Sequence, residues 1–347
     1  MANTNAYNAV LAKTRAMYGR HITAEQYQEM LRCRSVQDVA AFLKGQTHYG
    51  DALSNVVEHN IHRGQLENMM RKAAFEEYSR LYHFLPLTRN SLFQTIVMEE
   101  EIREILRMVL LLKSGDPKSF ILDLPVYLIR RAEVDLLAVA RVTRFEELIQ
   151  VMKEHPYAAL LRRFAPGEER GEIDYIGCEH AFYEYYFRHL FALVEKGCRG
   201  QERSELLGLI RTQVELVNIE HLYRFKRYLK SPQEEIVRSI YPHYYRVKAE
   251  QIREIVEAKD TDVLQNVLAA SGYRGRLALD EDSSVEEQTR RYFYQQCRRA
   301  LHFTTHVSVA FYAYCVLNRM ELSNIFHIVE GIRYQVPESE IRALIVR

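Results

Sequence analysis

The sequence predicts an all-α protein built from three similar helical units. Apolar residues recur at intervals of three and four along most of the chain, which is the spacing of one helix face. Fourteen Gly and eight Pro are few for 347 residues, so long helices are favoured over frequent tight turns. No alternating pattern is long enough to indicate a β-strand. We expect the three units at residues 1–118, 119–238 and 239–347.

Residues 211–230 contain the motif that defines the repeated unit. Wound as a helix, this stretch places Val214, Asn218 and Leu222 on one apolar face, and Glu215 lies one turn before Asn218. A polar side chain in such a stripe needs a partner, because an unpaired buried amide costs roughly 1–3 kcal/mol. We therefore expect Asn218 to be a structural polar group that ties this helix to a neighbouring segment.

The same pattern occurs near the end of the other two units. Glu321 and Asn324 stand where residues 211–230 have Glu215 and Asn218, and upstream Glu101 is aligned with Asn218. These five side chains form the expected structural polar signature. On the polar side of the closing helices, Arg107, Arg224 and Arg227 are candidate interface residues.

Further landmarks and helix signals recur in the same order in each unit. A Tyr followed four residues later by Leu ends each first hairpin, at Tyr49, Tyr157 and Tyr273, and a small apolar residue followed by Glu opens each long helix. The period is roughly 105–120 residues, far longer than the 20–50 residues of solenoid repeats. The expected elements are first hairpins at 7–53, 124–161 and 241–277, long helices at 57–81, 178–197 and 285–303, and closing segments at 92–113, 211–230 and 306–345.

Charge and cysteine content exclude several classes of protein. The 47 basic and 46 acidic residues nearly cancel, which argues against a strongly basic nucleic-acid binder. The five cysteines are scattered without a CxxC pair, which indicates a reducing compartment. The N-terminal residues lack the apolar run of a secretion signal. The longest apolar run, residues 307–317, is much shorter than the ~20 residues that span a bilayer, so any membrane attachment is expected to go through a partner.

Catalytic and cofactor motifs are missing from the sequence. It holds no GxxxxGK[ST], GxGxxG, HExxH or GxSxG, so we expect no enzyme, no cofactor and no metal. His302 and His306 have the spacing of a metal-binding pair on a helix, but no Cys or carboxylate follows at ligand spacing. A metal hydrolase built on these two histidines and a distant acid is therefore a minor alternative. Glu99–Glu101 is interpreted as ordinary helix charge, balanced by Arg103 and Arg107.

The repeated motifs also carry a family likeness. The Glu-x-x-Asn-Ile signature, the N-terminal YNAVLAKTRAM and the Tyr-x-x-x-Leu hairpin ends resemble the C subunit of bacterial and archaeal V/A-type rotary ATPases, and its eukaryotic relative, the d subunit of the V-ATPase. The likeness covers residues 7–345. The sequence departs from the family pattern at Glu101, where members tend to have Asn, and at Glu330, where the other two units have Arg107 and Arg224.

The resemblance implies a particular architecture and role. Members are all-α funnels of three helical units around a pseudo-threefold axis, and they are not catalytic. They lie on the cytoplasmic face of the membrane proteolipid ring and receive the tip of the central shaft, which the D and F subunits form, with a possible contact to the membrane stator. They thus couple shaft and ring rotation during ion transport. No nucleic acid and no direct membrane insertion are expected. The main alternative is an unrelated non-catalytic helical scaffold, which predicts a short repeat and an elongated particle.

Overall fold

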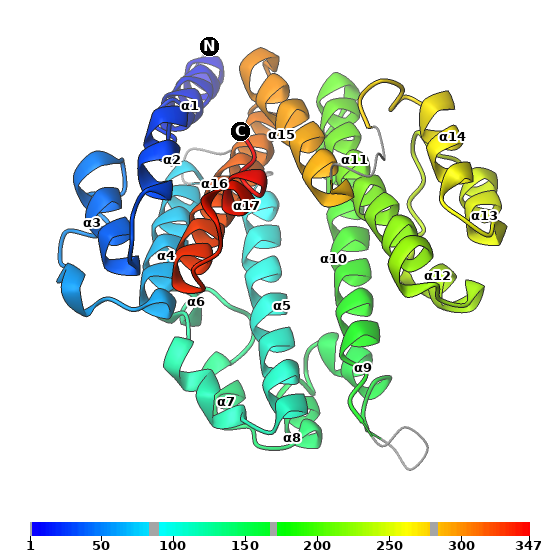
Figure 1. The fold of residues 1–347 in the computed structure, drawn as a ribbon, viewed down its shortest axis with the longest axis horizontal. Coiled ribbons are helices and arrows are strands. Elements are labelled where there is room, and N and C mark those ends of the chain that lie inside the picture. The colour runs from blue at the N-terminus through cyan, green and yellow to red at the C-terminus, as the bar shows by residue number, and fades with distance from the viewer. Residues whose placement is uncertain (1, 83–89, 167–171, 278–283) are drawn as a thin grey trace. The chain divides into compact units, whose positions relative to one another are not determined.

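The computed structural model describes residues 2–82, 90–166, 172–277 and 284–347, and every regular element within these ranges is a helix (Figure 1). The predicted all-α fold class is therefore confirmed. None of the helices in these ranges is long and apolar enough to cross a membrane. The chain divides into two compact units, a larger one of Met1–Leu85 with Cys198–Arg347, and a smaller one of Pro86–Gly197.

Helix α16 (Val307–Arg333) forms the core of the larger unit. Residues 307–318 are buried without exception, because this stretch is apolar nearly all round, as is typical of a helix enclosed by others. Helices α1, α4, α11 and α15 pack against it. The other elements are α1 (Ala2–Tyr18), α2 (Ala24–Leu31), α3 (Val36–Gln46), the short 3-10 turn η1 (Glu58–Asn60), α4 (Arg63–Tyr82), α11 (Gly200–Arg224), the π-helical turn η4 (Phe225–Leu229), α12 (Gln233–Ser239), α13 (Ala249–Glu257), α14 (Asp262–Ala270), α15 (Val285–Phe303) and α17 (Glu338–Ala343).

The smaller unit is organised around two long helices, α5 and α10, which lie side by side (Figure 1). Apolar side chains on both helices form its core, among them Ile105, Phe182 and Leu190. In the described part of the connection, residues 115–166 and 172–174, four short helices and a 3-10 turn lie between the two long helices. The bounds are α5 (Asn90–Ser114), η3 (Pro117–Asp123), α6 (Val126–Ile129), α7 (Leu136–Val139), α8 (Phe145–Val151), α9 (Tyr157–Arg162) and α10 (Tyr175–Gly197).

Several helices start where short polar side chains can accept a hydrogen bond from a free backbone N–H. Thr23 and Gln26 form a reciprocal capping box at α2, and Ser35 accepts from the Asp38 N–H at α3. Ser284 does the same at the start of α15. Each cap satisfies a backbone donor that the helix leaves unpaired, which fixes these start positions.

The expected helices are present, with shifted ends. The long helix of the third unit spans Val285–Phe303 as predicted, whereas the helix expected from residue 57 begins at Arg63, because Glu58–Asn60 form a 3-10 turn. Residues 211–230 comprise the second half of α11, which ends at Arg224, and the π-helical turn Phe225–Leu229. The division into three units at 118/119 and 238/239 and the pseudo-threefold funnel remain predictions.

Candidate functional site

Three buried glutamates, one on each of three long helices, occupy similar surroundings. Glu101 on α5, Glu215 on α11 and Glu321 on α16 are 2, 2 and 4% exposed. Each carboxylate accepts hydrogen bonds from one or two backbone N–H groups and from the hydroxyl of a buried tyrosine. We call each such arrangement a carboxylate node. Hydrogen bonds are required here, because a buried carboxylate without them is strongly unfavourable.

The Glu215 node lies in the larger unit. One carboxylate oxygen accepts from the backbone N–H groups of Tyr245 at 3.2 Å and Val247 at 2.7 Å, and the other accepts from the Tyr273 hydroxyl at 2.6 Å. The Arg246 guanidinium lies 4.0 Å from the carboxylate and donates to the Tyr273 hydroxyl at 3.3 Å. The node thus fixes the segment before α13 and the turn after α14 to helix α11.

The Glu101 node repeats this arrangement within the smaller unit. One oxygen accepts from the backbone N–H groups of Glu133 and Val134, the latter at 3.2 Å. The other oxygen lies 3.5 Å from the Tyr157 hydroxyl, which donates to it. Burial raises the pKa of the Glu101 carboxyl, and the two backbone N–H donors oppose that effect.

The Glu321 node connects segments that are far apart in sequence. Its oxygens accept from the Ile22 backbone N–H at 2.6 Å and from the Tyr49 hydroxyl at 2.9 Å. Ring nitrogens of His21 and His48 approach the same carboxyl to 3.4 and 3.5 Å. Helix α16 is thereby joined to the turn after α1 and to the end of α3.

Burial determines the charge state of the Glu321 node. It raises the pKa of Glu321 to about 8 and lowers the pKa of His21 to about 3, and it also lowers the pKa of His48. Near neutral pH all three groups are therefore favoured in their uncharged forms, and the His–Glu contacts are not ion pairs. Neither of the other two nodes has a histidine ring this close to its carboxylate among the contacts of the described residues.

Two asparagines, each one helical turn after a node, bind a backbone segment in the same way. The Asn218 side chain donates to the Tyr241 carbonyl at 2.9 Å and accepts from the Tyr241 N–H at 2.8 Å. Asn324 makes the equivalent pair with Val346, at 2.7 and 3.1 Å, and also donates to the Tyr27 hydroxyl. Each amide thus takes the place of a neighbouring peptide group and ties a closing helix to a later segment.

The nodes change the alignment of the first repeat. The sequence motif aligned Glu101 with Asn218. In the structure, Glu101 makes the same kind of contacts as Glu215 and Glu321, and these two glutamates lie three positions before the asparagine of their motif. Glu104, also buried, then occupies the asparagine position and is bound by Arg107 at 2.6 Å. The signal was present in the sequence as Glu-x-x-Glu-Ile at 101–105, which matches the other two copies if Glu replaces Asn.

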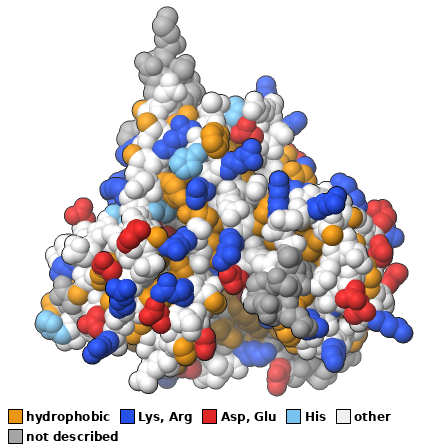
Figure 2. Space-filling view, turned by 45° about the horizontal axis from the view of Figure 1, so that its top comes forward, with side chains coloured by type: hydrophobic (Ala, Val, Ile, Leu, Met, Phe, Trp, Pro, Cys, Tyr) orange, Lys and Arg blue, Asp and Glu red, His pale blue; other side chains and the backbone are white. Residues whose placement is uncertain are grey.

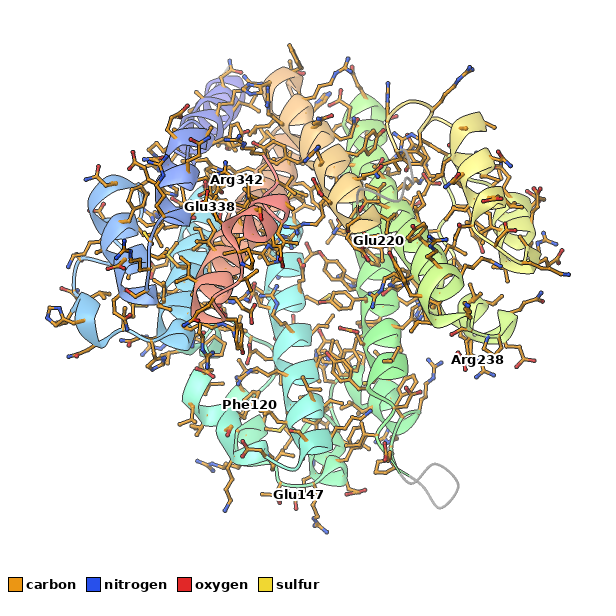
Figure 3. All side chains as sticks on the ribbon, viewed as in Figure 1. Phe120, Glu147, Glu220, Arg238, Glu338 and Arg342 are labelled. Carbon is orange, nitrogen blue, oxygen red and sulfur yellow. The ribbon has the colours of Figure 1, made fainter. Side chains whose placement is uncertain are left out.

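The three candidate interface arginines differ in their exposure to solvent. Arg107 is bound to Glu104 and lies over the ring of Phe120, labelled in Figure 3, at 4.0 Å. The Arg224 side chain is 57% exposed and lies 3.9 Å from Glu286. Arg227 is exposed on the π-helical turn. Arg224 and Arg227 thus reach solvent, whereas Arg107 serves the internal packing of the smaller unit.

Other polar side chains take structural positions. Glu220, labelled in Figure 3, accepts from the Thr289 hydroxyl, and burial raises its pKa to about 7. Glu330 is paired with Arg63 at 2.9 Å. His302 and His306 lie on either side of the break between α15 and α16, so they do not share one helix face. Across the ranges that the structure covers, no three His, Cys, Asp or Glu side chains are placed to hold a metal ion.

These features define a class of helical protein whose buried carboxylates bind its own backbone, an arrangement that holds helices in register. Comparison with known proteins then gives the family. The profile of the ATP synthase (C/AC39) subunit matches residues 10–344. Because this match covers nearly the whole sequence, the chain belongs to that family, and the resemblance seen in the sequence motifs is confirmed.

Individual relatives are distant but consistently named. The C subunit of the A-type ATP synthase of Pyrococcus abyssi is 21% identical over 347 residues, covering 98% of this chain and 90% of the relative. That of Methanosarcina mazei is 20% identical over 331 residues, covering 94 and 88%. That of Thermococcus kodakarensis is 23% identical over 221 residues, or 63% of this chain, and the matched part spans 57% of that relative's length.

Proposed function

We propose that this chain is the non-catalytic central-stalk component of a V/A-type rotary ATPase, a socket that couples the rotor shaft to the membrane proteolipid ring. The observation that carries the proposal is the family match over residues 10–344. The proposed partners are the proteolipid ring and the D and F subunits of the central stalk, with a possible contact to the membrane stator. The proposed location is the cytoplasmic face of the membrane, reached through the complex.

The internal structure supports a mechanical role. A coupler that transmits torque must resist deformation, and close-packed helical cores transmit strain. The three carboxylate nodes add directional hydrogen bonds that a shear between helix and loop would have to break, at about 1 kcal/mol or more for each bond. The ring-and-funnel arrangement itself is part of the proposal and derives from the family resemblance.

The surface supports partner binding through local charge. Basic and acidic side chains are both scattered over the face shown in Figure 2, in keeping with the formal net charge of +1. A near-zero net charge permits different partners to bind at different faces, and electrostatic complementarity contributes mainly to specificity and association rate. Arg224 and Arg227 are the proposed contacts to partners, because both are exposed.

Co-purification tests the proposal directly. A tagged chain is expressed in its native host, extracted in mild detergent and analysed by mass spectrometry. The proteolipid and the two other stalk proteins should co-purify with it. Recovery of the chain alone, or only with proteins unrelated to an ATPase, would contradict the proposal. The Arg224→Glu variant should reduce this recovery. Arg253→Glu, a reversal at a side chain that is 72% exposed on α13, is the matched control and should leave recovery unchanged.

A further inference from the structure

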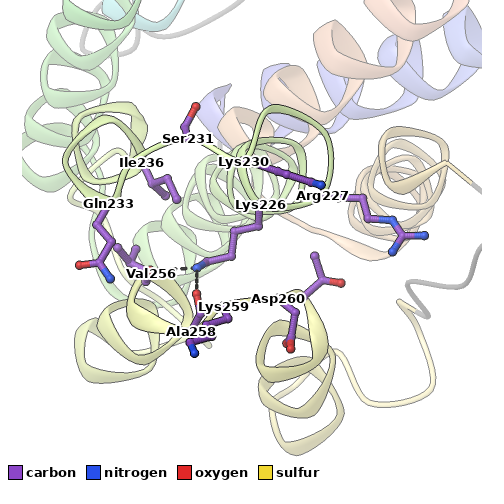
Figure 4. Close-up of a pocket in the computed structure, with 11 residues that line it drawn as sticks. Lys226, Arg227, Lys230, Ser231, Gln233, Ile236, Val256, Ala258, Lys259 and Asp260 are labelled. Carbon is purple, nitrogen blue, oxygen red and sulfur yellow. Dashed lines mark hydrogen bonds between the residues drawn. The ribbon is translucent and has the colours of Figure 1, made fainter.

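A pocket of about 350 Å³ lies at the end of α11, where the chain turns into α12 and faces the α13–α14 connection (Figure 4). All of its lining residues belong to the larger unit. Four of them are cationic, Lys226, Arg227, Lys230 and Lys259, and one is acidic, Asp260. Of these residues, the proposed partner contacts include Arg227 alone, and they leave the lysines of the pocket unexplained.

An irregular backbone shapes one wall of the pocket. Helix α11 ends in the π-helical turn Phe225–Leu229, after which Lys230 adopts a left-handed conformation with φ of 49°. Single π-helical turns occur frequently at functional sites, and a left-handed conformation costs a residue other than Gly roughly 1–2 kcal/mol. The Ser231 N–H donates to the Phe225 carbonyl at 3.1 Å, which closes this turn. Helices commonly end in a left-handed residue, usually Gly, and here that position at the rim of the pocket is taken by Lys230.

Lys226 fixes the opposite wall. Its ammonium group donates to the carbonyl oxygens of Val256, at 2.8 Å, and Ala258, as the dashed lines in Figure 4 show. These carbonyls belong to the C-terminal end of α13, where helices leave acceptors unpaired and favour a cation. Burial lowers the pKa of Lys226. Lys226 thus joins α11 to α13 and keeps the two sides of the pocket at a set separation.

The remaining charges leave the pocket positive. Neither the Lys230 nor the Lys259 ammonium has an ion pair or hydrogen bond to any residue that the structure describes. Asp260 accepts a hydrogen bond from the Asp262 backbone N–H at 3.0 Å, which commits one of its oxygens to the start of α14. Two free ammonium groups and the Arg227 guanidinium therefore face a pocket lined by a single carboxylate.

We propose that this pocket binds a phosphate-bearing anion through Lys230, Lys259 and Arg227. A volume of about 350 Å³ suits a compact small ligand or headgroup, since ligand pockets typically measure roughly 300–1,000 Å³. Ammonium and guanidinium groups are the usual protein donors to phosphate. The same chemistry is offered by soluble phosphate esters and by the headgroups of acidic lipids, and the experiment separates these two sources.

Calorimetric titration of the full chain with inorganic pyrophosphate at low ionic strength tests the site itself. Lys230→Gln and Lys259→Gln should each weaken binding about threefold, the factor expected for one exposed charge contact. Asp260→Asn should tighten binding by a similar factor, because it removes the one negative charge that lines the pocket. Its amide oxygen can still accept from the Asp262 N–H, so the start of α14 keeps this hydrogen bond. Lys153→Gln, an equal charge change at an exposed position of the smaller unit, should change nothing. Circular dichroism confirms that each variant is folded.

Vesicle sedimentation identifies the source of the phosphate. The pocket is assigned to an acidic lipid if the chain binds vesicles that contain phosphatidylglycerol and does not bind vesicles of pure phosphatidylcholine. In that case Lys230→Gln should weaken vesicle binding, and pyrophosphate should displace the chain from the vesicles. Pyrophosphate binding without vesicle binding would assign it to a soluble anion. Binding of neither probe, or binding that Lys153→Gln weakens as much as the two pocket lysine variants do, would overturn the proposal.

Discussion

Replacing Glu321 by Gln should change how the stability of the larger unit depends on pH. The carboxyl is buried among the Ile22 N–H, the Tyr49 hydroxyl and two histidine rings, and burial raises its pKa from 4.5 to about 8. Gln has nearly the shape of the protonated carboxyl but cannot ionise. The variant therefore preserves the node as it is at low pH, with the carboxyl protonated, and removes the free-energy cost of ionising the carboxyl at higher pH.

The sign and size of the effect follow from linkage. A pKa raised in the folded state gives a stability contribution that is complete below pH 4.5 and is lost as the pH rises through about 8. Each pH unit in this window costs about 1.4 kcal/mol per proton. From pH 5 to pH 8 the wild-type protein should therefore lose about 4 kcal/mol relative to Glu321→Gln. The lowered pKa values of His21 and His48 act oppositely, stabilising above pH 6.5, but both proteins share them.

Urea unfolding at half-unit steps between pH 5 and pH 8 measures this difference, and hydrogen exchange of α16 amides reports on the larger unit alone. Glu338→Gln is the control, because Glu338 is 47% exposed on α17 beside Arg342, both labelled in Figure 3. Its pH profile should run parallel to that of the wild-type protein. A Glu321→Gln profile that also runs parallel would show that the Glu321 carboxyl is not protonated in the folded state, and the reasoning would fail.

Two further substitutions test the polar contacts of α11 by the same urea measurement. Asn218→Leu leaves the Tyr241 N–H without its acceptor, whereas the Tyr241 carbonyl still accepts from the His243 N–H at 2.8 Å. At about 1–3 kcal/mol for the unpaired N–H and about 1 kcal/mol for the lost bond to the carbonyl, less the gain from a buried Leu, the variant should lower the unfolding free energy by about 1–3 kcal/mol. Asn266→Leu, at an exposed position on α14, should stay within about 0.5 kcal/mol. Tyr273→Phe removes the donor that lies 2.6 Å from the Glu215 carboxylate and should lower the unfolding free energy by about 1–3 kcal/mol. Tyr334→Phe, at a residue that is 62% exposed, should leave the unfolding free energy unchanged. Equal losses of unfolding free energy at the buried and exposed positions would show that the nodes do not stabilise the fold.

Much of the local structure was predictable because it depends on neighbouring residues. The apolar period and the Ser284 cap place α15 at Val285–Phe303, and the Ser-Gly-Asp-Pro run at 114–117 marks the end of α5. Tyr49, Tyr157 and Tyr273 were visible as repeated landmarks. Their chemical role was not, because a pattern of spacing does not say which carboxylate a hydroxyl meets.

The sequence pattern did not predict contacts between distant segments or irregular turns of the backbone. Tyr49 and Glu321 are 272 residues apart, and only the packing of α3 against α16 brings them together. The π-helical turn at Phe225–Leu229 continues the apolar period of α11, so sequence periodicity does not distinguish it from an α-helix. The sequence pattern did not predict the cationic pocket, because its lysines lie within this turn, directly after it and in the α13–α14 connection.

The Glu321 node also sets an order of events during synthesis. The hairpin that ends at Tyr49 leaves the ribosome early, but the carboxylate that completes its hydrogen bonding is made 272 residues later. At roughly 5–20 residues per second, that interval lasts roughly 15–55 s. Throughout this time Tyr49 and the Ile22 N–H lack their native acceptor, so the earliest segment of the chain reaches its final packing among the last, when α16 arrives to receive it.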